Sequence, residues 1–443
     1  MIFSSFCRII TGFLMQHSGP LTFVGFGFGP IQAGLFVLEA FRSGNFGRLV
    51  IAEALPESVH AVRRNHGHVA INVAHKDRIE SLSIGPLELE DPAEPADRAR
   101  LVEAVTEASE IATAVPSIRF YKSEAAGSIH RILAAGLEKR AGKAVLVYAA
   151  ENHNHAAEAL EDAVLTEVSA PKRDSVRAAT CFLNTVVGKM SGVIADPDQI
   201  AELGLRTVTP DDPRAFHVET FNRILISSVR FPKELAVQRG IEVFEEKPDL
   251  FPFEEAKLYG HNAAHAVAAY LGSLRDLVRL EELREVAGAV DFVRRALLEE
   301  AGAALLEKWK GVDPLFTRGG FDAYVDDLLD RMFNPFLGDL VARVARDPER
   351  KLAWNDRLVG TMRLVVAQGI RPARIAIGAA AALICMRPDL RSPDAEPDPV
   401  LEEIWRPANP DPAEKEEILR LIRQALPKLR SWITRGSWTF PDG

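Results

Sequence analysis

The chain has 443 residues, of which 47% are hydrophobic, and its formal net charge is -9. This length exceeds what one hydrophobic core usually organises, so we expect two domains. The acidic balance, without any basic stripe, argues against nucleic acid as the main partner, because neutralising phosphates requires a basic surface. Three widely separated cysteines, Cys7, Cys181 and Cys385, favour a reduced cytoplasmic protein and supply no zinc-type cluster.

The first 16 residues, MIFSSFCRIITGFLMQ, form an apolar stretch. They lack the basic start and the small-residue cleavage site of a signal peptide, and Arg8 divides a run too short to span a bilayer. We therefore interpret residues 1–20 as an extension ahead of the first strand, with Met15 as the natural start. We expect no membrane association.

Residues 21–190 alternate between strand-like and helix-like patterns. The opening segment reads strand, glycine turn, helix and second strand, which is typical of the first unit of a parallel α/β domain. Further strands are expected at 68–73, 110–115 and 144–152, with helices at 96–109 and 128–142. The alternation predicts a parallel sheet that is covered by helices on both faces.

Beyond residue 190 the pattern changes to long amphipathic helices, such as 273–309 and 321–333, with few strand-like runs. We predict a mainly α-helical second domain over residues 191–388. A proline-rich stretch then leads to a last helix with an Asp411 cap, so residues 389–443 are predicted to be a linker and a C-terminal helix.

The turn after the first strand is rich in glycine, with Gly25, Gly27 and Gly29. Glycines there let backbone N–H groups approach a pyrophosphate at the helix N-terminus. From Gly27 the sequence reads G-x-G-x-x-Q, an incomplete dinucleotide fingerprint with Gln32 in the third place. Glu53 ends the next strand, where a carboxylate can accept both ribose hydroxyls and repel a 2′-phosphate. These features predict a Rossmann-type domain that binds NAD in preference to NADP.

The alternative is a glycine turn that only packs a helix on a strand. A later strand, EIATAVP, ends at the same expected edge of the sheet, so its backbone would border the nicotinamide. The predicted cofactor-binding residues are Gly27, Gly29, Ile31, Gln32, Glu53, Thr113, Ala114 and Val115.

The stretch EEAKLYGHNAAHAVAAYLG (254–272) is a small-residue helix interrupted by Lys257, Asn262 and His265. On an ideal helix these three side chains cover less than half of the circumference. They suit oxidation of a secondary alcohol, with a desolvated lysine as base, an amide for the oxyanion and a histidine for positioning. The small residues would let the helix lie against the cofactor domain. The alternative is that all three side chains have structural roles.

Other dehydrogenase chemistries lack their residues. None of the five tyrosines is followed four residues later by lysine, so the short-chain Tyr-x-x-x-Lys base is absent. The histidine pairs His66 with His68 and His153 with His155 are not completed by cysteine or carboxylate ligands at a recognisable spacing. We therefore predict no metal.

With these residues in view, the sequence resembles the polyol-specific long-chain dehydrogenases over residues 22–388. The K-x4-N-x2-H signature of that family matches Lys257, Asn262 and His265, and AHAVAAYLG follows it. Further matches are TAVP (113–116), GLEKR (136–140), EN (151–152), VETF (218–221) and NPFLGDLVARVARDPERKL (334–352).

The resemblance implies that Lys257 is the general base, that Asn152 and Asn262 hold the alcohol or oxyanion, and that His265 assists in positioning the substrate. It also implies that Arg343 and Lys351 reach the substrate and that Arg346 adds charge there, which suits a phosphate or carboxylate. Without the family, this arginine-rich run is a helix end with solvated charges.

Two departures concern the phosphate turn and the substrate. Gln32 and Ala33 stand where the family has glycine and arginine, and Gly188 and Lys189 replace the acid and the arginine of a V-D-R-I segment. The resemblance implies an NAD-dependent exchange of mannitol 1-phosphate with fructose 6-phosphate. Alternatives are a hexuronate reductase, a mannitol 2-dehydrogenase and a catalytically inactive NAD-binding sensor or scaffold. The oligomeric state is not defined by these features.

Overall fold

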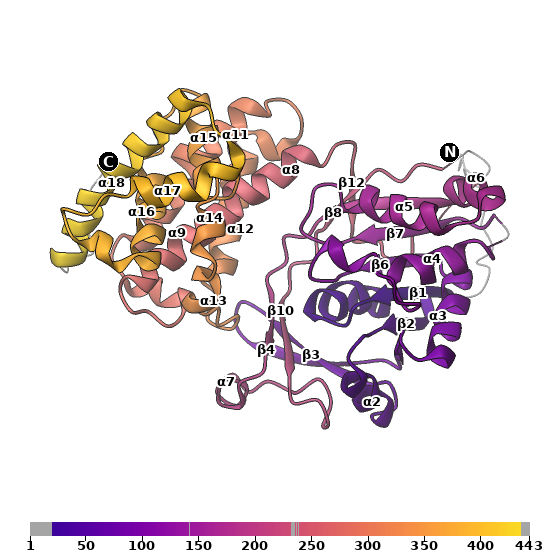
Figure 1. Ribbon diagram of the computed structural model, residues 1–443. Helices are drawn as coiled ribbons and strands as arrows, with labels where there is room; N and C mark the ends of the chain where they lie inside the picture. Colours follow the sequence, from indigo (N-terminus) through magenta and orange to yellow (C-terminus); the bar gives the residue numbers. More distant parts are fainter. Residues whose placement is uncertain (1–19, 141, 232–234, 236, 238, 436–443) are drawn as a thin grey trace, which may run out of the picture.

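The computed structural model describes residues 20–435 except 141, 232–234, 236 and 238. Figure 1 shows an α/β part that contains the N-terminal half of the chain, beside a helical part that contains the C-terminal half. This architecture confirms the predicted fold class. Met15 and the other residues before Pro20 lie outside the described residues, so the interpretation of the N-terminal extension stays a prediction.

The α/β part is built on an eight-stranded sheet in the order β12-β11-β8-β7-β6-β1-β2-β5. Its strands are β1 (Leu21–Phe26), β2 (Phe46–Ala52), β5 (Glu88–Glu90), β6 (Glu110–Thr113), β7 (Val145–Ala149), β8 (Thr180–Val186), β11 (Leu225–Ser227) and β12 (Glu245–Lys247). Neighbouring strands in the stretch β8-β7-β6-β1-β2-β5 pair in parallel, whereas β11 is antiparallel to β8. The strand order reverses between β1 and β6, so a crevice is expected outside their carboxyl ends.

Both faces of this sheet are covered because its strands alternate apolar side chains between them. Val147 on β7 packs with α3 (Pro95–Glu107), α4 (Ile129–Leu137) and α5 (Ala156–Glu167). Its neighbour Tyr148 packs on the opposite face with the segment that continues into α1 (Leu38–Ser43). The remaining helices of this part are α2 (Pro56–Arg64), α6 (Ala170–Ala179) and α7 (Pro197–Glu202).

A second sheet, in the order β4-β3-β10-β9, was not predicted. Its strands are β3 (Val69–Ala74), β4 (Ile79–Ile84), β9 (Ser191–Ile194) and β10 (Ala215–Glu219). The strand expected at 68–73 exists, but it lies in this sheet, antiparallel to β4 and parallel to β10. Gly34 allows close approach of the first helix, because a Cβ there would lie 2.5 Å from Cγ1 of Val218 on β10.

The predicted domain boundary at residue 190 is too early. Strands β9 to β12 all follow that residue, and all of them pair within the two sheets of the α/β part. They escaped prediction because they are short and several of them are polar, as in β12, which reads Glu-Glu-Lys. We propose a boundary near residue 248, just before the first helix of the helical part.

The helical part forms one core. Its α-helices are α8 (Phe251–Glu255), α9 (Asn262–Ser273), α10 (Ala289–Arg295), α11 (Ala303–Lys308), α12 (Arg318–Met332), α13 (Val341–Ala345), α14 (Pro348–Lys351), α15 (Val359–Ala367), α16 (Ala373–Met386), α17 (Asp398–Trp405) and α18 (Pro412–Arg435). Leu390, Trp405 and Ile422 are buried in the same cluster as α9 and α16. The C-terminal segment is therefore an integral layer of this part, whereas the sequence predicted a linker and a separate helix.

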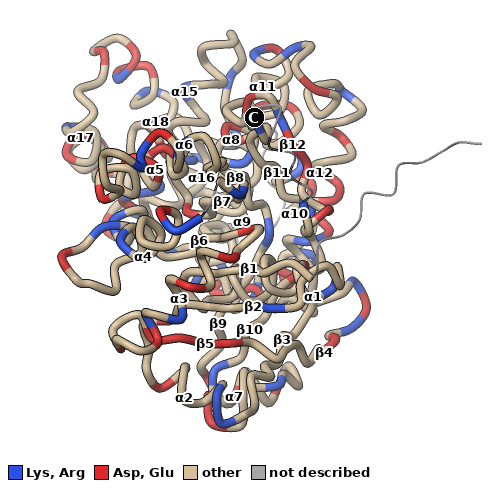
Figure 2. Tube along the Cα trace, turned by 90° about the vertical axis from the view of Figure 1, so that its right-hand side faces the viewer, with Lys and Arg blue, Asp and Glu red and all other residues tan. Residues whose placement is uncertain are grey.

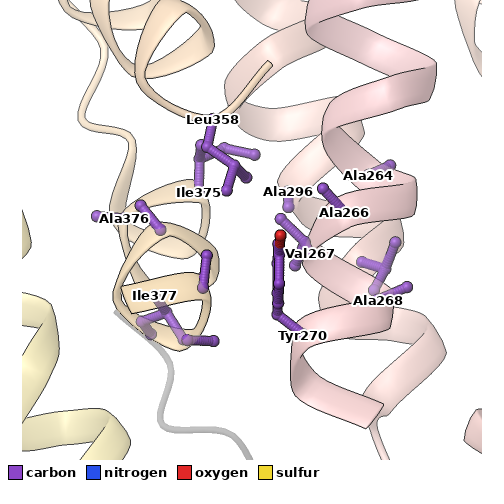
Figure 3. Close-up of a cluster of buried hydrophobic side chains, with 14 of the residues drawn as sticks. Ala264, Ala266, Val267, Ala268, Tyr270, Ala296, Leu358, Ile375, Ala376 and Ile377 are labelled. Carbon is purple, nitrogen blue, oxygen red and sulfur yellow. The ribbon is translucent and has the colours of Figure 1, made fainter. Parts of the chain in front are cut away.

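The small residues of α9 pack within the helical part. Figure 3 shows Ala264, Val267 and Tyr270 on this helix near Ile375 and Ile377 on α16. Gly378 on α16 is closest, since a Cβ there would lie 2.4 Å from Cγ2 of Val267. The expectation that these small residues serve contact with the cofactor domain is wrong, because they are covered by other helices of the same core.

The surface is mixed in charge. Figure 2 shows lysines and arginines interspersed with aspartates and glutamates along the trace. Among the described residues, no helix combines the length and hydropathy that a membrane span needs.

Candidate active site

Lys257 lies where the two parts of the molecule meet. Its Nζ donates to Oδ1 of Asn152 at 3.3 Å, and Asn152 follows β7 at the carboxyl edge of the large sheet. Both residues line a cavity of about 470 Å³ together with Asn262 at the start of α9. The structure thus brings three of the four predicted catalytic residues to one cavity, with walls from both parts of the chain.

The electrostatics of this cavity lower the pKa of Lys257 and so increase its neutral fraction. Burial lowers the pKa of Lys257 to about 8, the positive charge of Arg357 lowers it as well, and Glu254 opposes both effects. Glu254 lines the same cavity, and burial raises the pKa of its carboxyl to about 7. A lysine of this kind holds a useful neutral fraction near neutral pH, so it is able to accept a proton.

His265, the fourth predicted catalytic residue, is engaged elsewhere. Its Nε2 lies 3.0 Å from Oδ2 of the buried Asp339, whose Oδ1 accepts from Nε of Arg343 at 2.9 Å. Lys257 lies in a π-helical segment, Ala256–His261, that directly precedes α9, so the angles of an ideal α-helix do not apply along this stretch. His265 is therefore not among the residues that line the cavity of Lys257.

A histidine of the same helical stretch, His261, does share a cavity with Lys257. It lies in a smaller cavity of about 80 Å³, which Lys257 also lines. Sequence reasoning did not single it out, although its spacing of four residues from Lys257 is the usual spacing of helical neighbours.

The three cations predicted to reach the substrate do not line the Lys257 cavity. Arg343 borders a different small cavity, where it is paired with Asp339. The ammonium of Lys351 donates to the backbone carbonyl of Arg346 and lies 5.7 Å from the ring centroid of Tyr270. The side chains of Arg343 and Lys351 are therefore held by partners within the helical part, whereas Arg346 is exposed.

Two other arginines, Arg350 and Arg357, line the cavity of Lys257. Arg350 belongs to the same arginine-rich segment, which bends at Asp347, a residue with a φ of 54°, whereas Arg357 follows that segment in the turn before α15. This left-handed residue ends the run that began in α13 and begins α14 in a new direction. The pair Asp347–Pro348 is a sequence signal for such a bend, but the prediction did not use it.

The glycine turn has the geometry of a close backbone approach. Gly27 has a φ of 85°, and a Cβ on it would lie 2.8 Å from the carbonyl oxygen of Ala114. A Cβ on Gly29 would meet no atom within 4 Å, so this face of the turn is open. Ile31 follows at the helix start, next to Pro30, and the backbone N–H groups there are available to an anion.

Glu53 lies beside this turn. Its Oε2 accepts from the backbone N–H of Phe28 at 2.7 Å and its Oε1 from that of Leu55 at 2.8 Å. The carboxylate therefore fixes the turn, and each oxygen keeps a further lone pair. Gln32 differs from the prediction, because its side-chain amide is fully buried, has no hydrogen-bond partner among the described residues and lies against Gly25. Only its backbone is positioned to face a cofactor.

The segment Thr113–Val115 is held next to the turn by Glu151. Thr113 Oγ1 and the backbone N–H of Val115 each donate to this buried carboxylate at 2.9 Å, and the hydroxyl of Tyr121 also donates to it. Burial raises the pKa of Glu151, whereas these hydrogen bonds lower it. Glu151, the glutamate of the EN motif, therefore has a structural role at the carboxyl edge of the sheet, one residue before Asn152.

In the described part of the chain, no group of three or more His, Cys, Asp or Glu side chains is arranged to hold a metal ion. His153 and His155 line the cavity of Lys257, with ring centroids 6.3 Å apart.

Gly188 and Lys189, where the chain departs from the family, lie at the edge of the site. Gly188 lines the smaller cavity, whereas Lys189 is buried and donates to the backbone carbonyls of Glu219 and Phe221. Burial lowers the pKa of Lys189 to about 8. The lysine therefore holds β10 and the chain that follows it, and the glycine leaves space beside Lys257.

Comparison with known proteins identifies close sequence relatives. Residues 249–424 match the mannitol dehydrogenase C-terminal domain. The chain is 31% identical to the mannitol-1-phosphate 5-dehydrogenase of Exiguobacterium sibiricum, over 83% of this chain and 86% of that protein. It is also 31% identical to the enzyme of the same name from Geobacillus thermodenitrificans, over 72% of this chain and 78% of that protein.

Solved structures share the fold at lower identity. Mannitol 2-dehydrogenase of Pseudomonas fluorescens, in a ternary complex with NAD and D-mannitol, is 16% identical with a TM-score of 0.66 over 94% of both chains. A D-sorbitol dehydrogenase is 16% identical with a TM-score of 0.69, over 95% of this chain and 94% of that one. The resemblance found in the sequence motifs is confirmed: the chain belongs to the polyol dehydrogenase family that includes the mannitol-1-phosphate 5-dehydrogenases.

Proposed function

We propose that the protein is an NAD-dependent oxidoreductase that interconverts mannitol 1-phosphate and fructose 6-phosphate without a metal. The observation that carries this proposal is the pairing of Lys257 with Asn152, because it joins an amine with a pKa of about 8 to the carboxyl edge of a dinucleotide-type sheet. The names and coverage of the sequence relatives support the same activity.

In this mechanism, Lys257 takes the proton from the reacting hydroxyl in the oxidative direction and returns it in the reductive direction. The amides of Asn152 and Asn262 hold the oxygen as its charge changes. The cavity walls come from both parts of the chain, so substrate and cofactor meet between them. His265 acts indirectly as a positioning residue, through Asp339 and Arg343.

NAD suits the residues of the first turn. The open face at Gly29, the free N–H groups near Ile31 and the carboxylate of Glu53 would hold the pyrophosphate and the adenosine ribose. The backbone of Thr113–Val115 would border the nicotinamide. When bound, NAD exchanges a hydride with the carbon that carries the reacting oxygen.

We assign the phosphate of the substrate to Arg350 and Arg357, the two arginines that line the cavity. Planar guanidinium groups bind phosphate oxygens with two donors each. Arg357 uses its Nε on Asp356 at 2.8 Å, which leaves its terminal nitrogens for a ligand. Arg343, Arg346 and Lys351 would then affect substrate binding only indirectly, by shaping this segment.

A cytoplasmic location fits this substrate, and the described cysteines, Cys181 and Cys385, are both free thiols.

The direct test is reduction of a substrate panel with NADH: fructose 6-phosphate, fructose, fructuronate and tagaturonate. We expect fructose 6-phosphate to have the highest kcat/KM. Turnover of fructuronate or tagaturonate without turnover of fructose 6-phosphate would establish a hexuronate reductase. Turnover of fructose alone would establish a mannitol 2-dehydrogenase. NAD binding without turnover of any panel member would support the inactive sensor or scaffold.

A further inference from the structure

Lys257 stands between two cavities of unequal size. It lines the larger one, of about 470 Å³, together with Asn152, Arg350 and Arg357. It also lines the smaller one, of about 80 Å³, together with His261 and Gly188. A substrate whose reacting carbon lies beside Lys257 therefore meets a short space on one side and a long space with two arginines on the other.

The smaller cavity depends on Gly188. A Cβ on this residue would have a single neighbour within 4 Å, Cε1 of Phe221 at 3.5 Å, so a side chain there would project into the cavity. The remaining wall is formed by Val186, Phe221, Arg223, Leu225, Phe253, Ala256, Leu315, Tyr324 and Arg331. The cavity is thus largely apolar and has room for one small group.

The charges around the smaller cavity do not favour a phosphate. Arg331 donates to Oε1 of Glu219 at 2.9 Å and to Oδ2 of Asp327 at 2.8 Å, so its charge is already compensated. Arg223 is exposed, where solvent and salt weaken its field. An uncharged polar group fits this environment better than an anion.

His261 is the buried polar side chain of this cavity. The residue is 6% exposed, and neither ring nitrogen has a hydrogen bond to any described residue. Burial and the neighbouring cations Arg331 and Lys257 hold the pKa of His261 well below its ordinary value, so the ring is neutral. A neutral imidazole carries one donor and one acceptor, which is the complement of a hydroxyl group. A ligand hydroxyl in the cavity would give this ring the partner that buried polar groups usually have.

We propose that the smaller cavity holds the hydroxymethyl group next to the reacting carbonyl, and that His261 binds its hydroxyl. In fructose 6-phosphate the carbonyl is C2, so one carbon extends to one side and four carbons with the phosphate extend to the other. This short arm matches the cavity of His261, and the long arm matches the cavity of Arg350 and Arg357. His261 is then a specificity-determining residue that sets which way round the substrate binds.

The inference rests on the proposed function for the place of the phosphate, but the hydroxymethyl ketone is common to all four panel substrates. The test compares fructose 6-phosphate with 1-deoxyfructose 6-phosphate, which lacks only the hydroxyl at issue. We expect the wild-type kcat/KM to favour the hydroxylated substrate by about 10-fold or more, because the analogue leaves His261 unpaired. In His261→Leu this preference should fall to near unity, and His261→Gln should restore part of it.

His265→Leu is the matched control, one helical turn further along the same helix. It should lower turnover by disturbing Asp339 while keeping the preference for the hydroxylated substrate. Thermal unfolding of each variant verifies its fold, and His261→Gln provides the comparison if the leucine variant does not fold. An unchanged preference in the folded His261 variants would overturn the inference.

A second experiment fills the smaller cavity with a side chain. Gly188→Val should raise KM for fructose 6-phosphate at least several-fold without changing NAD affinity, and an unchanged KM would contradict the assignment. If the enzyme turns over fructose and rejects fructose 6-phosphate, the proposed function fails. The same ratio measured with 1-deoxyfructose then decides the role of His261 separately.

Discussion

The cofactor end and the substrate end of the candidate site are built in different ways. At the cofactor end, Gly27, Glu53 and the Thr113–Val115 backbone are held by strand order and main-chain hydrogen bonds. At the substrate end, His261 lies in a π-helical segment, Arg350 follows a bend at Asp347, and Arg357 lies in the turn before α15. Backbone geometry determines the first set, whereas local irregularities determine the second.

This difference predicts that substrate specificity changes more easily than cofactor use. A substitution at the turn must preserve contacts that also hold the sheet together, as Glu53 shows with its two main-chain hydrogen bonds. At the substrate end, by contrast, the glycine that this chain has at position 188 in place of the acid of the family only enlarges a cavity. We therefore expect cofactor variants to lose affinity together with selectivity, and substrate-side variants to change one property at a time.

The largest effect should come from Lys257→Ala. Loss of the general base should lower kcat by about 10³-fold, since positioned bases contribute roughly 10²–10⁴-fold. NAD affinity, measured by fluorescence titration, should stay unchanged because Lys257 belongs to the substrate end. Lys415→Ala, at an exposed ion pair with Glu402, is the control and should keep full activity. Equal activity of the two variants would remove Lys257 from the mechanism.

Arg357→Ala should have the next largest effect, and mainly on phosphorylated substrate. Loss of charged hydrogen bonds worth about 1.5–3 kcal/mol predicts a 10- to 100-fold lower kcat/KM for fructose 6-phosphate. Activity with fructose should change far less. Arg343→Ala is the comparison, because Arg343 is paired with Asp339 outside this cavity. A larger phosphate-specific loss in Arg343→Ala would reassign the phosphate.

Glu53→Ser tests the cofactor end. We expect NAD to lose about 10-fold in kcat/KM, because both the ribose contact and the support of the turn disappear. NADP should gain relative to NAD, since the carboxylate that repels a 2′-phosphate is removed. Kinetics with both cofactors measure this ratio. An unchanged ratio would mean that Glu53 only supports the turn and does not contact the ribose.

The smallest expected effect is a shift in pH dependence. Lys257 must be neutral to accept a proton, so mannitol 1-phosphate oxidation should rise with pH through the lysine pKa of about 8 and then level off. Arg357 lowers this pKa, so its removal should move the midpoint upward by a fraction of a pH unit. A downward shift in kcat profiles would contradict this coupling.

Much of the fold could be predicted because its signals are local. The strand, glycine turn and second strand at the N-terminus are confirmed, and so is the change to helices later in the chain. The second sheet could not be predicted, because periodicity identifies β3 as a strand without indicating its neighbours. Its partner β10 lies far along the chain, and only a packed structure joins them.

The candidate site divides in the same way. The pairing of Lys257 with Asn152 follows from the family motifs, and the structure brings these residues within 3.3 Å. His261 lies outside the family motif and was not predicted, although its spacing of four residues from Lys257 is that of helical neighbours. Gln32 was predicted from its place in the fingerprint, but its burial depends on the packing against Gly25.

The π-helical segments have a consequence for how this enzyme family could diversify. Gln32–Val37 lies in the helix after the cofactor turn, and Ala256–His261 lies in the helix that carries Lys257. A π-helical turn accommodates one residue more than an α-helical turn, so removing a single residue there would restore a regular helix and rotate the preceding side chains by about 100°. Single-residue insertions and deletions at these two segments would therefore re-aim the base or the phosphate turn while leaving the helices in place.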